Sequence, residues 1–222
     1  MIAIPQPKPK EKEGNFTLSG VTWSTFKTLV TEIGDDRAYL IAYSEGVLAF
    51  KMPFPEHEIP TGMLESFIEA IADELEIEIM KLGSWSLKRE DLQRFIEPDS
   101  CFYIQNEARV RGRRLDLAVD PSPDLAIESD NTHSSLDKHS IYAALGIPEL
   151  WRYTRQSLLV YHLIGDRYEQ REESLAFPFL PLAEIPNFIE RSREIGQRSA
   201  VRLFRQRIQE ILRDRLPNNR ES

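Results

Sequence analysis

Apolar residues recur at helical spacing in four stretches of the chain. Residues 22–33 place Trp23, Phe26, Leu29, Val30 and Ile33 on one side, and Gly34 follows as a stop signal. Residues 60–76 repeat this pattern more strongly. Residues 135–145 carry it between the capping run 134–137 and Gly146, and residues 182–216 carry it with a break near Gly196. The sequence therefore predicts four main helices, the last of them interrupted.

Shorter apolar runs between these helices predict β-strands. The runs cover 37–43, 47–52, 77–82, 85–87, 101–104, 124–128, 149–153 and the two halves of 158–171. Ser44-Glu45-Gly46 between the first two runs predicts a three-residue hairpin loop, with glycine where a positive φ is required. Gly165-Asp166 turns the last hairpin. Residues 88–94 are expected to form a short helical turn or a loop.

The order of the central elements predicts the fold class. A strand at 124–128, a helix at 135–145 and a strand at 149–153 form a crossover unit, whose two strands pair in parallel. The class is α/β, with a central mixed sheet flanked by helices, extra β-hairpins and a C-terminal helical segment. Prolines alternate with lysines in residues 1–15, which are expected to be a disordered arm. Residues 16–180 then form the main domain, and residues 181–222 a helical extension packed on it.

Two short acidic phrases interrupt the apolar runs. The first is Glu97-Pro98-Asp99, and the second runs from Asp124 to Glu128 inside a predicted strand. A carboxylate in a strand costs free energy unless something pairs with it. Because side chains alternate along a strand, Asp124 and Glu128 share one face.

Lys138 follows at the start of the next predicted helix. Asp99, Asp124, Glu128 and Lys138 are therefore expected to converge at one end of the sheet. Carboxylates with a lysine, and no histidine or cysteine ligand, are typical of a Mg²⁺ phosphodiester site. Asp99 and Asp124 each follow a proline. The alternative is therefore that each of them only ends a turn and caps the start of a strand.

Composition and charge narrow the class of protein. The chain has 222 residues, 41% hydrophobic and 29% charged, which is typical of a soluble globular protein. The sequence has no apolar run as long as a membrane span and no signal-peptide hydrophobic region at its N-terminus. The single cysteine, Cys101, excludes a disulfide framework and fits a reducing cytoplasm.

The net charge of −8 argues against broad binding of polyanions, because phosphate affinity depends on clustered basic residues. Arginines do cluster locally. One group precedes the second acidic phrase and another lies near the C-terminus: Arg109, Arg111, Arg113 and Arg114, then Arg191, Arg193, Arg198, Arg202, Arg205 and Arg207. Each group is either a nucleic-acid contact or a solvated face.

Four phrases in this order resemble a known family. They are Glu97-Pro98-Asp99, Pro123-Asp124-Leu-Ala-Ile-Glu128, Asp137-Lys138 followed by Tyr142, and Gly146-Ile-Pro-Glu149-Leu-Trp151. Residues 35–160 are similar to the restriction endonuclease-like proteins long catalogued as a domain of unknown function, within the PD-(D/E)XK nuclease superfamily. The resemblance implies that Asp99 is the first acidic metal ligand and that Glu128 is the acidic residue of the ExK element.

The sequence departs from this pattern at the lysine. The position two beyond Glu128 is Asp130, and the resemblance implies that Lys138 on the following helix takes the lysine's role. In this superfamily a glutamate of the first core helix often joins the metal site. Glu58 and Glu65 are the candidates, and a solvated helix residue is the alternative for each.

These features favour a cytoplasmic Mg²⁺- or Mn²⁺-dependent nuclease that hydrolyses phosphodiester bonds. DNA is the favoured substrate over RNA. Asp99 and Glu128, with Asp124, would hold the ion, and Lys138 would orient the attacking water. The alternative function is a catalytically silent domain of the same fold that acts as a binding or assembly module.

A homodimer is also expected, because duplex cleavage needs two sites. The hairpin 158–171, the run 177–181 and the helix with Val201, Phe204, Ile208 and Ile211 carry more apolar surface than one small sheet covers. The alternative is that these segments pack back on their own domain.

Overall fold

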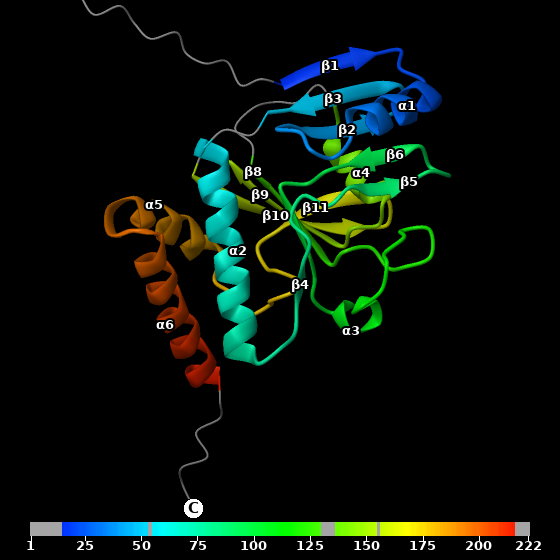
Figure 1. Ribbon diagram of the computed structural model, residues 1–222. Helices are drawn as coiled ribbons and strands as arrows, with labels where there is room; N and C mark the ends of the chain where they lie inside the picture. The colour runs from blue at the N-terminus through cyan, green and yellow to red at the C-terminus, as the bar shows by residue number, and fades with distance from the viewer. Residues whose placement is uncertain (1–14, 53–54, 130–135, 155, 216–222) are drawn as a thin grey trace, which may run out of the picture.

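Two open β-sheets form the framework of the protein (Figure 1). The computed structural model describes residues 15–52, 55–129, 136–154 and 156–215. Sheet A is antiparallel, with the spatial order β1 (Asn15–Ser19), β3 (Val47–Lys51), β2 (Leu40–Ser44), β6 (Arg94–Ile96) and β5 (Leu87–Arg89). Sheet B has the order β11 (Arg167–Arg171), β10 (Ser157–Ile164), β9 (Glu149–Thr154), β8 (Leu125–Ser129), β7 (Ser100–Tyr103) and β4 (Met80–Lys81).

Sheet B is mixed, as the sequence predicts. β8 pairs with β9 in parallel, with Glu128 opposite Arg152, and pairs with β7 in the antiparallel direction. The crossover between β8 and β9 contains α4 (Lys138–Ala144), which packs on the face of sheet B turned toward sheet A. Apolar residues of both sheets and of α4 form one buried cluster, so the two sheets and this helix share a core.

The opposite face of sheet B is covered by long helices (Figure 1). These are α2 (Pro55–Leu75), α5 (Ile185–Ile195) and α6 (Gln197–Arg215), with a short 3₁₀ turn, η1 (Leu182–Glu184), before α5. Phe67 of α2 packs against Phe204 of α6, with 4.3 Å between ring centroids and the rings tilted by 33°. Gly196 separates α5 from α6 at a φ of 85°, which is the break that the sequence predicts.

Helix α1 (Trp23–Ile33) packs on sheet A and shows how the local sequence sets its ends. The Thr22 side chain accepts a hydrogen bond from Thr25 N at 3.1 Å, and Gly34 ends the helix with a φ of 72°. Phe26 is buried against Tyr43 of β2 and Phe95 of β6. The helix predicted at 22–33 is therefore confirmed.

The expected uncovered apolar strip is wrong. Phe177, Val201, Phe204 and Ile208 are all buried in the same cluster as α2 and sheet B, because the α5–α6 pair folds back over that face. These segments therefore pack on their own chain, and the argument they gave for a dimer interface is removed.

Two local predictions also need correction. The β2–β3 turn has two residues, Glu45 and Gly46, with φ values of 51° and 81°, which is a type I′ hairpin rather than a three-residue loop. Of the two alternatives for residues 88–94, the loop holds at 90–93, which form the turn between β5 and β6, and the helical turn does not, because 88–89 and 94 belong to those strands. Those strands are only three residues each, too short for a period-two pattern to stand out.

The remaining short element is α3 (Glu107–Val110), which follows β7. Most of the predicted N-terminal arm, residues 1–14, lies outside the described residues. Among the helices of the described ranges, none has the length and apolar character that crossing a membrane requires.

Candidate active site: a buried carboxylate pair between the two sheets

The chain passes from sheet A to sheet B at the first acidic phrase. β6 ends at Ile96 and β7 begins at Ser100, so Glu97-Pro98-Asp99 is the connection. Glu97 turns toward sheet A, where its carboxylate accepts hydrogen bonds from Ile41 N at 2.8 Å and Ser86 Oγ at 2.7 Å and pairs with Arg37. Asp99 turns toward sheet B. The phrase therefore supplies one carboxylate to each sheet.

Asp99 and Glu128 come together at the end of β8. The antiparallel pairing of β7 with β8 places Asp99 beside the last residues of β8, and Asp99 Oδ2 accepts a hydrogen bond from Ser129 N at 2.6 Å. The side chains of Asp99 and Glu128 are only 5% and 4% exposed. Two carboxylates are thus held side by side and nearly removed from water.

Lys138 reaches this pair from α4. Its Nζ donates to Glu128 Oε2 at 2.7 Å, and Tyr142 OH donates to Glu128 Oε1 at 2.6 Å. Residues four apart lie on the same face of a helix, which explains why both side chains meet one carboxylate. Asp137 begins the helix, and its side chain accepts from Ser140 N at 3.4 Å. The structure therefore brings Asp99, Glu128 and Lys138 into one site.

A fourth residue of the cluster, Lys51, was missed by the sequence analysis. Lys51 is the last residue of β3 in sheet A, and its Nζ lies 2.7 Å and 2.6 Å from the two carboxylate oxygens of Asp99. The same nitrogen lies 3.3 Å from Glu128 Oε2 and 3.1 Å from Ser129 O. The available signal was a lysine directly after the apolar run Val47-Leu-Ala-Phe. Nothing in the sequence indicated that β3 faces the end of β8.

The electrostatics of the cluster separate its two carboxylates. Burial raises the pKa of Asp99 above its ordinary value, and the neighbouring Glu128 charge adds to this, against the opposing charge of Lys51. Burial also acts to raise the pKa of Glu128, but the ammonium groups of Lys138 and Lys51 outweigh it and bring that pKa to about 2. Glu128 is therefore the carboxylate that stays ionised, and Asp99 is the one that takes up a proton first.

Asp124 does not join this site, which corrects the prediction that it converges with the other carboxylates. Its Oδ2 accepts from Ile104 N at 2.6 Å and Asn106 N at 2.9 Å, and its Oδ1 accepts from Asn106 Nδ2 at 2.5 Å. Asp124 and Glu128 flank opposite ends of β8, and a strand rises about 3.3 Å per residue. Two residues on one face of a strand can still lie far apart along it, and these two are about 13 Å apart. Asp124 instead holds the turn after β7.

The helix glutamate Glu65 lies on the other face of sheet B from the Glu128 carboxylate. Glu65 of α2 accepts a hydrogen bond from Ser100 Oγ at 2.7 Å and lies 3.6 Å from Lys81 Nζ, on the face of sheet B opposite α4. Glu58 is exposed on the same helix. The described contacts of Glu65 are thus with Ser100 and Lys81 rather than with Asp99 or Glu128.

The arginine group at 109–114 lies near α3, at the Asp124 end of sheet B. Arg111 pairs with Glu107 at 2.6 Å, Arg113 pairs with Asp120 at 2.7 Å, and Arg109 donates to Asn106 Oδ1 at 2.8 Å. Acidic neighbours therefore balance much of this charge, and it is placed at the far end of β8 from Glu128.

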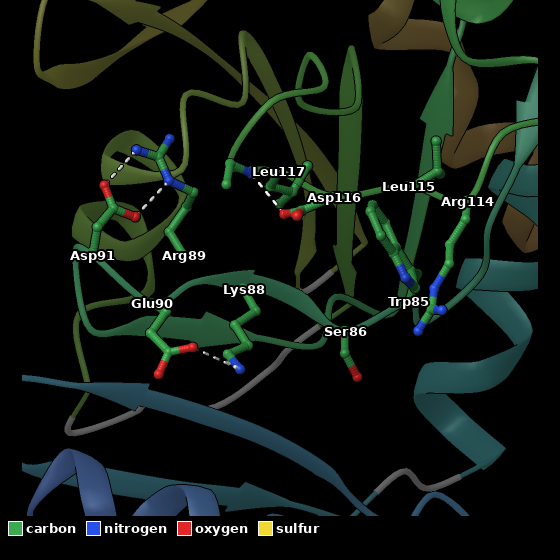
Figure 2. Close-up of a pocket in the computed structure, with 11 residues that line it drawn as sticks. Trp85, Ser86, Lys88, Arg89, Glu90, Asp91, Arg114, Leu115, Asp116 and Leu117 are labelled. Carbon is green, nitrogen blue, oxygen red and sulfur yellow. Dashed lines mark hydrogen bonds and ion pairs between the residues drawn. The ribbon is translucent and has the colours of Figure 1, made fainter.

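A pocket of about 880 Å³ lies between the β5–β6 turn and residues 114–118 (Figure 2). Trp85 and Arg114 line it, and four of its charged residues form local pairs: Arg89 with Asp91 at 2.7 Å, and Lys88 with Glu90 at 3.6 Å. None of the clustered residues Asp99, Glu128, Lys51 and Lys138 lines it. This pocket is therefore not the place where the candidate chemistry is assembled.

The donor atoms of the cluster suit a hard divalent cation. Asp99, Glu128 Oε2 and the carbonyl oxygen of Ser129 all lie within 3.3 Å of one ammonium nitrogen, so oxygens of three residues already surround one positive charge. Mg²⁺ in proteins commonly takes one or two carboxylates and keeps several waters. Three or more acidic, histidine or cysteine side chains do not gather at any point within the described ranges. The set is therefore an open arrangement of oxygen donors, too small for a closed protein cage.

The mixed sheet, the crossover helix and the buried acidic pair define a restriction endonuclease-like α/β protein. The model of the Uma2 family, described as "Putative restriction endonuclease", matches residues 23–192. The chain therefore belongs to the Uma2 family. This confirms the resemblance stated from the four sequence phrases.

A solved structure supports the same fold. It is a protein of Anabaena variabilis ATCC 29413, described as a putative nuclease belonging to DUF820, with a TM-score of 0.50 and 16% sequence identity. The match covers 82% of this chain and 99% of that chain. Among curated proteins, none matches this chain.

Proposed function

We propose that this protein is a Mg²⁺-dependent nuclease that hydrolyses phosphodiester bonds in DNA. The observation that carries the proposal is the Asp99–Glu128 pair, two carboxylates with nearly unexposed side chains at the end of a strand, held by lysines from two different elements. Membership of a family described as restriction endonucleases, and the nuclease description of the Anabaena protein, support the reaction class. The choice of ion and of DNA rests on the oxygen donors and on the family resemblance.

Asp99, Glu128 and the carbonyl group of Ser129 would hold the ion. A bound divalent cation polarises a phosphate oxygen and lowers the pKa of a bound water. The low pKa of Glu128 keeps this carboxylate anionic over the working pH range, so it is available as a ligand without prior loss of a proton. The Tyr142 hydroxyl fixes its other oxygen, which orients Oε2 toward the lysines.

Lys138 would act next to the ion. Its ammonium group sits on the first residue of α4, with the backbone fixed by the Asp137 cap. From there it would orient the attacking water or stabilise the charge that develops on the phosphate. Its side chain is 18% exposed, more than the side chains of the two carboxylates, so it lies on the solvent side of the cluster.

The substrate and assembly follow from the same chemistry. A duplex needs one site for each strand, which a two-fold dimer would supply. The dimer proposal now rests on this requirement alone, because the apolar helices pack on their own chain. The free, buried thiol of Cys101 is consistent with a cytoplasmic protein. Sedimentation of a single species at 25.7 kDa would exclude the dimer.

The proposal is tested by cleavage of plasmid DNA with Mg²⁺ or Mn²⁺, with EDTA as the negative control. Glu128→Gln keeps the shape of the side chain and removes a ligand charge, so the cleavage rate is expected to fall by at least about 100-fold. Glu169→Gln is the matched control, since Glu169 pairs with Arg171 on the outer strand β11 of sheet B. If the parent protein cleaves no nucleic acid, or Glu128→Gln cleaves as well as the parent, the silent binding module becomes the better function.

A further inference from the structure

The Lys51 side chain crosses from sheet A to the acidic pair of sheet B and occupies its centre. Its Nζ contacts both oxygens of Asp99, at 2.7 Å and 2.6 Å, and also Glu128 Oε2 and Ser129 O, at 3.3 Å and 3.1 Å. The Lys51 side chain is 12% exposed, so this contact is made largely out of water. One ammonium group therefore collects the three residues that the proposed function assigns to the metal.

We propose that Lys51 is a built-in competitor of the divalent cation, whose ammonium must leave the acidic pair before the metal can bind there. The inference rests on the proposed function, because it concerns the same metal-binding oxygens. It adds a residue that lowers the affinity for the ion, because the ammonium group must be displaced before the ion binds.

The Lys51 ammonium group and a metal ion would compete for the same space. Mg²⁺ lies about 2.0–2.1 Å from its oxygen ligands. An ammonium nitrogen within hydrogen-bond distance of the same oxygens fills the space that the ion would need. The two cations therefore exclude one another at this centre.

The acidic pair already contacts positive charge. Among the described contacts, Lys51 and Lys138 each place a positive charge directly against the Asp99 and Glu128 carboxylates. A divalent cation bound while Lys51 stays in place would crowd positive charge in excess around the same buried oxygens, which is unfavourable. Withdrawal of Lys51 into solvent reduces that excess and frees the oxygens at the same time.

The position of Lys51 in the fold allows its side chain to move away from the acidic pair. Lys51 ends β3, and the next residue, Met52, is 49% exposed. A lysine carries its charge on a flexible four-carbon stem, so the ammonium can leave the pair while the β2–β3 hairpin stays in place. Lys138 differs because its Nζ meets the pair from the α4 side, at Glu128 Oε2.

The experiment measures Mn²⁺ binding, without nucleic acid, by isothermal titration calorimetry on the full chain. The variants are Lys51→Met and Lys51→Gln, and Lys138→Met is the matched control that removes an equal charge from the same cluster. Both Lys51 variants are expected to bind Mn²⁺ at least tenfold more tightly than the parent, and more tightly than Lys138→Met. Asp99→Asn added to Lys51→Met is expected to abolish the gain.

Thermal unfolding gives a second readout that does not depend on activity. Without metal, the Lys51 variants are expected to melt below the parent, since the acidic pair loses its counter-ion, and Mn²⁺ should raise their midpoint more than the parent's. Lys51→Gln keeps a hydrogen-bond donor and serves where Lys51→Met folds poorly.

The outcomes separate the two proposals. If the parent binds Mn²⁺ and the Lys51 variants bind it no more tightly than the parent or Lys138→Met, the competitor role is overturned and the nuclease proposal stands. If neither the parent nor any variant binds Mn²⁺, the metal site itself fails, and the role of Lys51 fails with it.

Discussion

Glu97 and Asp99 are separated by a single proline, yet their carboxylates serve different sheets. Glu97 holds Ile41 N and Arg37 on sheet A, and Asp99 accepts from Ser129 N on sheet B. The first acidic phrase is therefore both a structural connection and one half of the candidate site. The two residues can be separated experimentally.

Glu97→Ala is expected to lower the stability of the protein without removing the metal site. Glu97 and Arg37 are 4% and 7% exposed, and removing one partner of a buried pair costs about 3–5 kcal/mol. Asp99→Asn is expected to abolish Mn²⁺ binding with a smaller loss of stability. Urea unfolding and calorimetry on both variants check this, and loss of Mn²⁺ binding in folded Glu97→Ala would contradict the division of roles.

Lys138→Met is expected to reduce the rate of DNA cleavage by about 100- to 1000-fold while Mn²⁺ binding persists, because the lysine acts on the water or phosphate rather than on the ion. Lys27→Met is the control, since Lys27 forms an exposed pair with Glu90 on the surface of sheet A. Single-turnover cleavage at saturating metal gives the measurement. A Lys138→Met protein that cleaves at the parent rate would assign this lysine a purely structural role.

Asp124→Ala is expected to destabilise the protein by about 1–3 kcal/mol, because Ile104 N and the backbone and side chain of Asn106 lose their acceptor. Mn²⁺ affinity should stay within about twofold of the parent, since Asp124 lies at the other end of β8. Urea unfolding with a parallel metal titration tests both parts. A folded Asp124→Ala protein without metal binding would return Asp124 to the site.

Glu149 gives a prediction for pH dependence away from the site. This residue is fully buried, and burial raises its pKa above 4.5, although hydrogen bonds from Trp151 Nε1 and Ala176 N act in the opposite direction. A raised pKa in the folded state means that the folded protein holds a proton that the unfolded chain has released. The contribution of Glu149 to stability is therefore full below pH 4.5 and is lost as the pH rises through the folded-state pKa.

The test compares the parent with Glu149→Gln, which cannot titrate. The free energy of unfolding of the parent should fall relative to that of the variant as the pH rises from about 4 to about 7. Loss of the Glu149 proton in the folded protein should also change the tryptophan fluorescence, because the indole nitrogen of Trp151 donates directly to Glu149 at 2.7 Å. Parallel pH profiles for the two proteins would show that Glu149 has no raised pKa.

Part of the fold follows directly from local sequence. The helix at 22–33 is predicted to its end at Gly34, because an apolar stripe and a terminal glycine both act within a few residues. The parallel β8–β9 pair was predictable for a similar reason, since a strand, a helix and a strand in that order have one common arrangement. The division of the strands into two sheets was not, because which strands pair is decided by contacts far apart in the sequence.

For the site, local sequence is enough to give the residue types and their order: Asp99 after a proline, Glu128 inside an apolar strand, and Lys138 at a helix start. Strand alternation correctly gave a face but could not give a position along it, so Asp124 was grouped with residues about 13 Å away. Lys51 of sheet A reaches the acidic pair of sheet B only through the packing of the folded chain. That contact joins positions 48 and 77 residues apart, and it depends on how two sheets pack through a shared core, which no local pattern encodes.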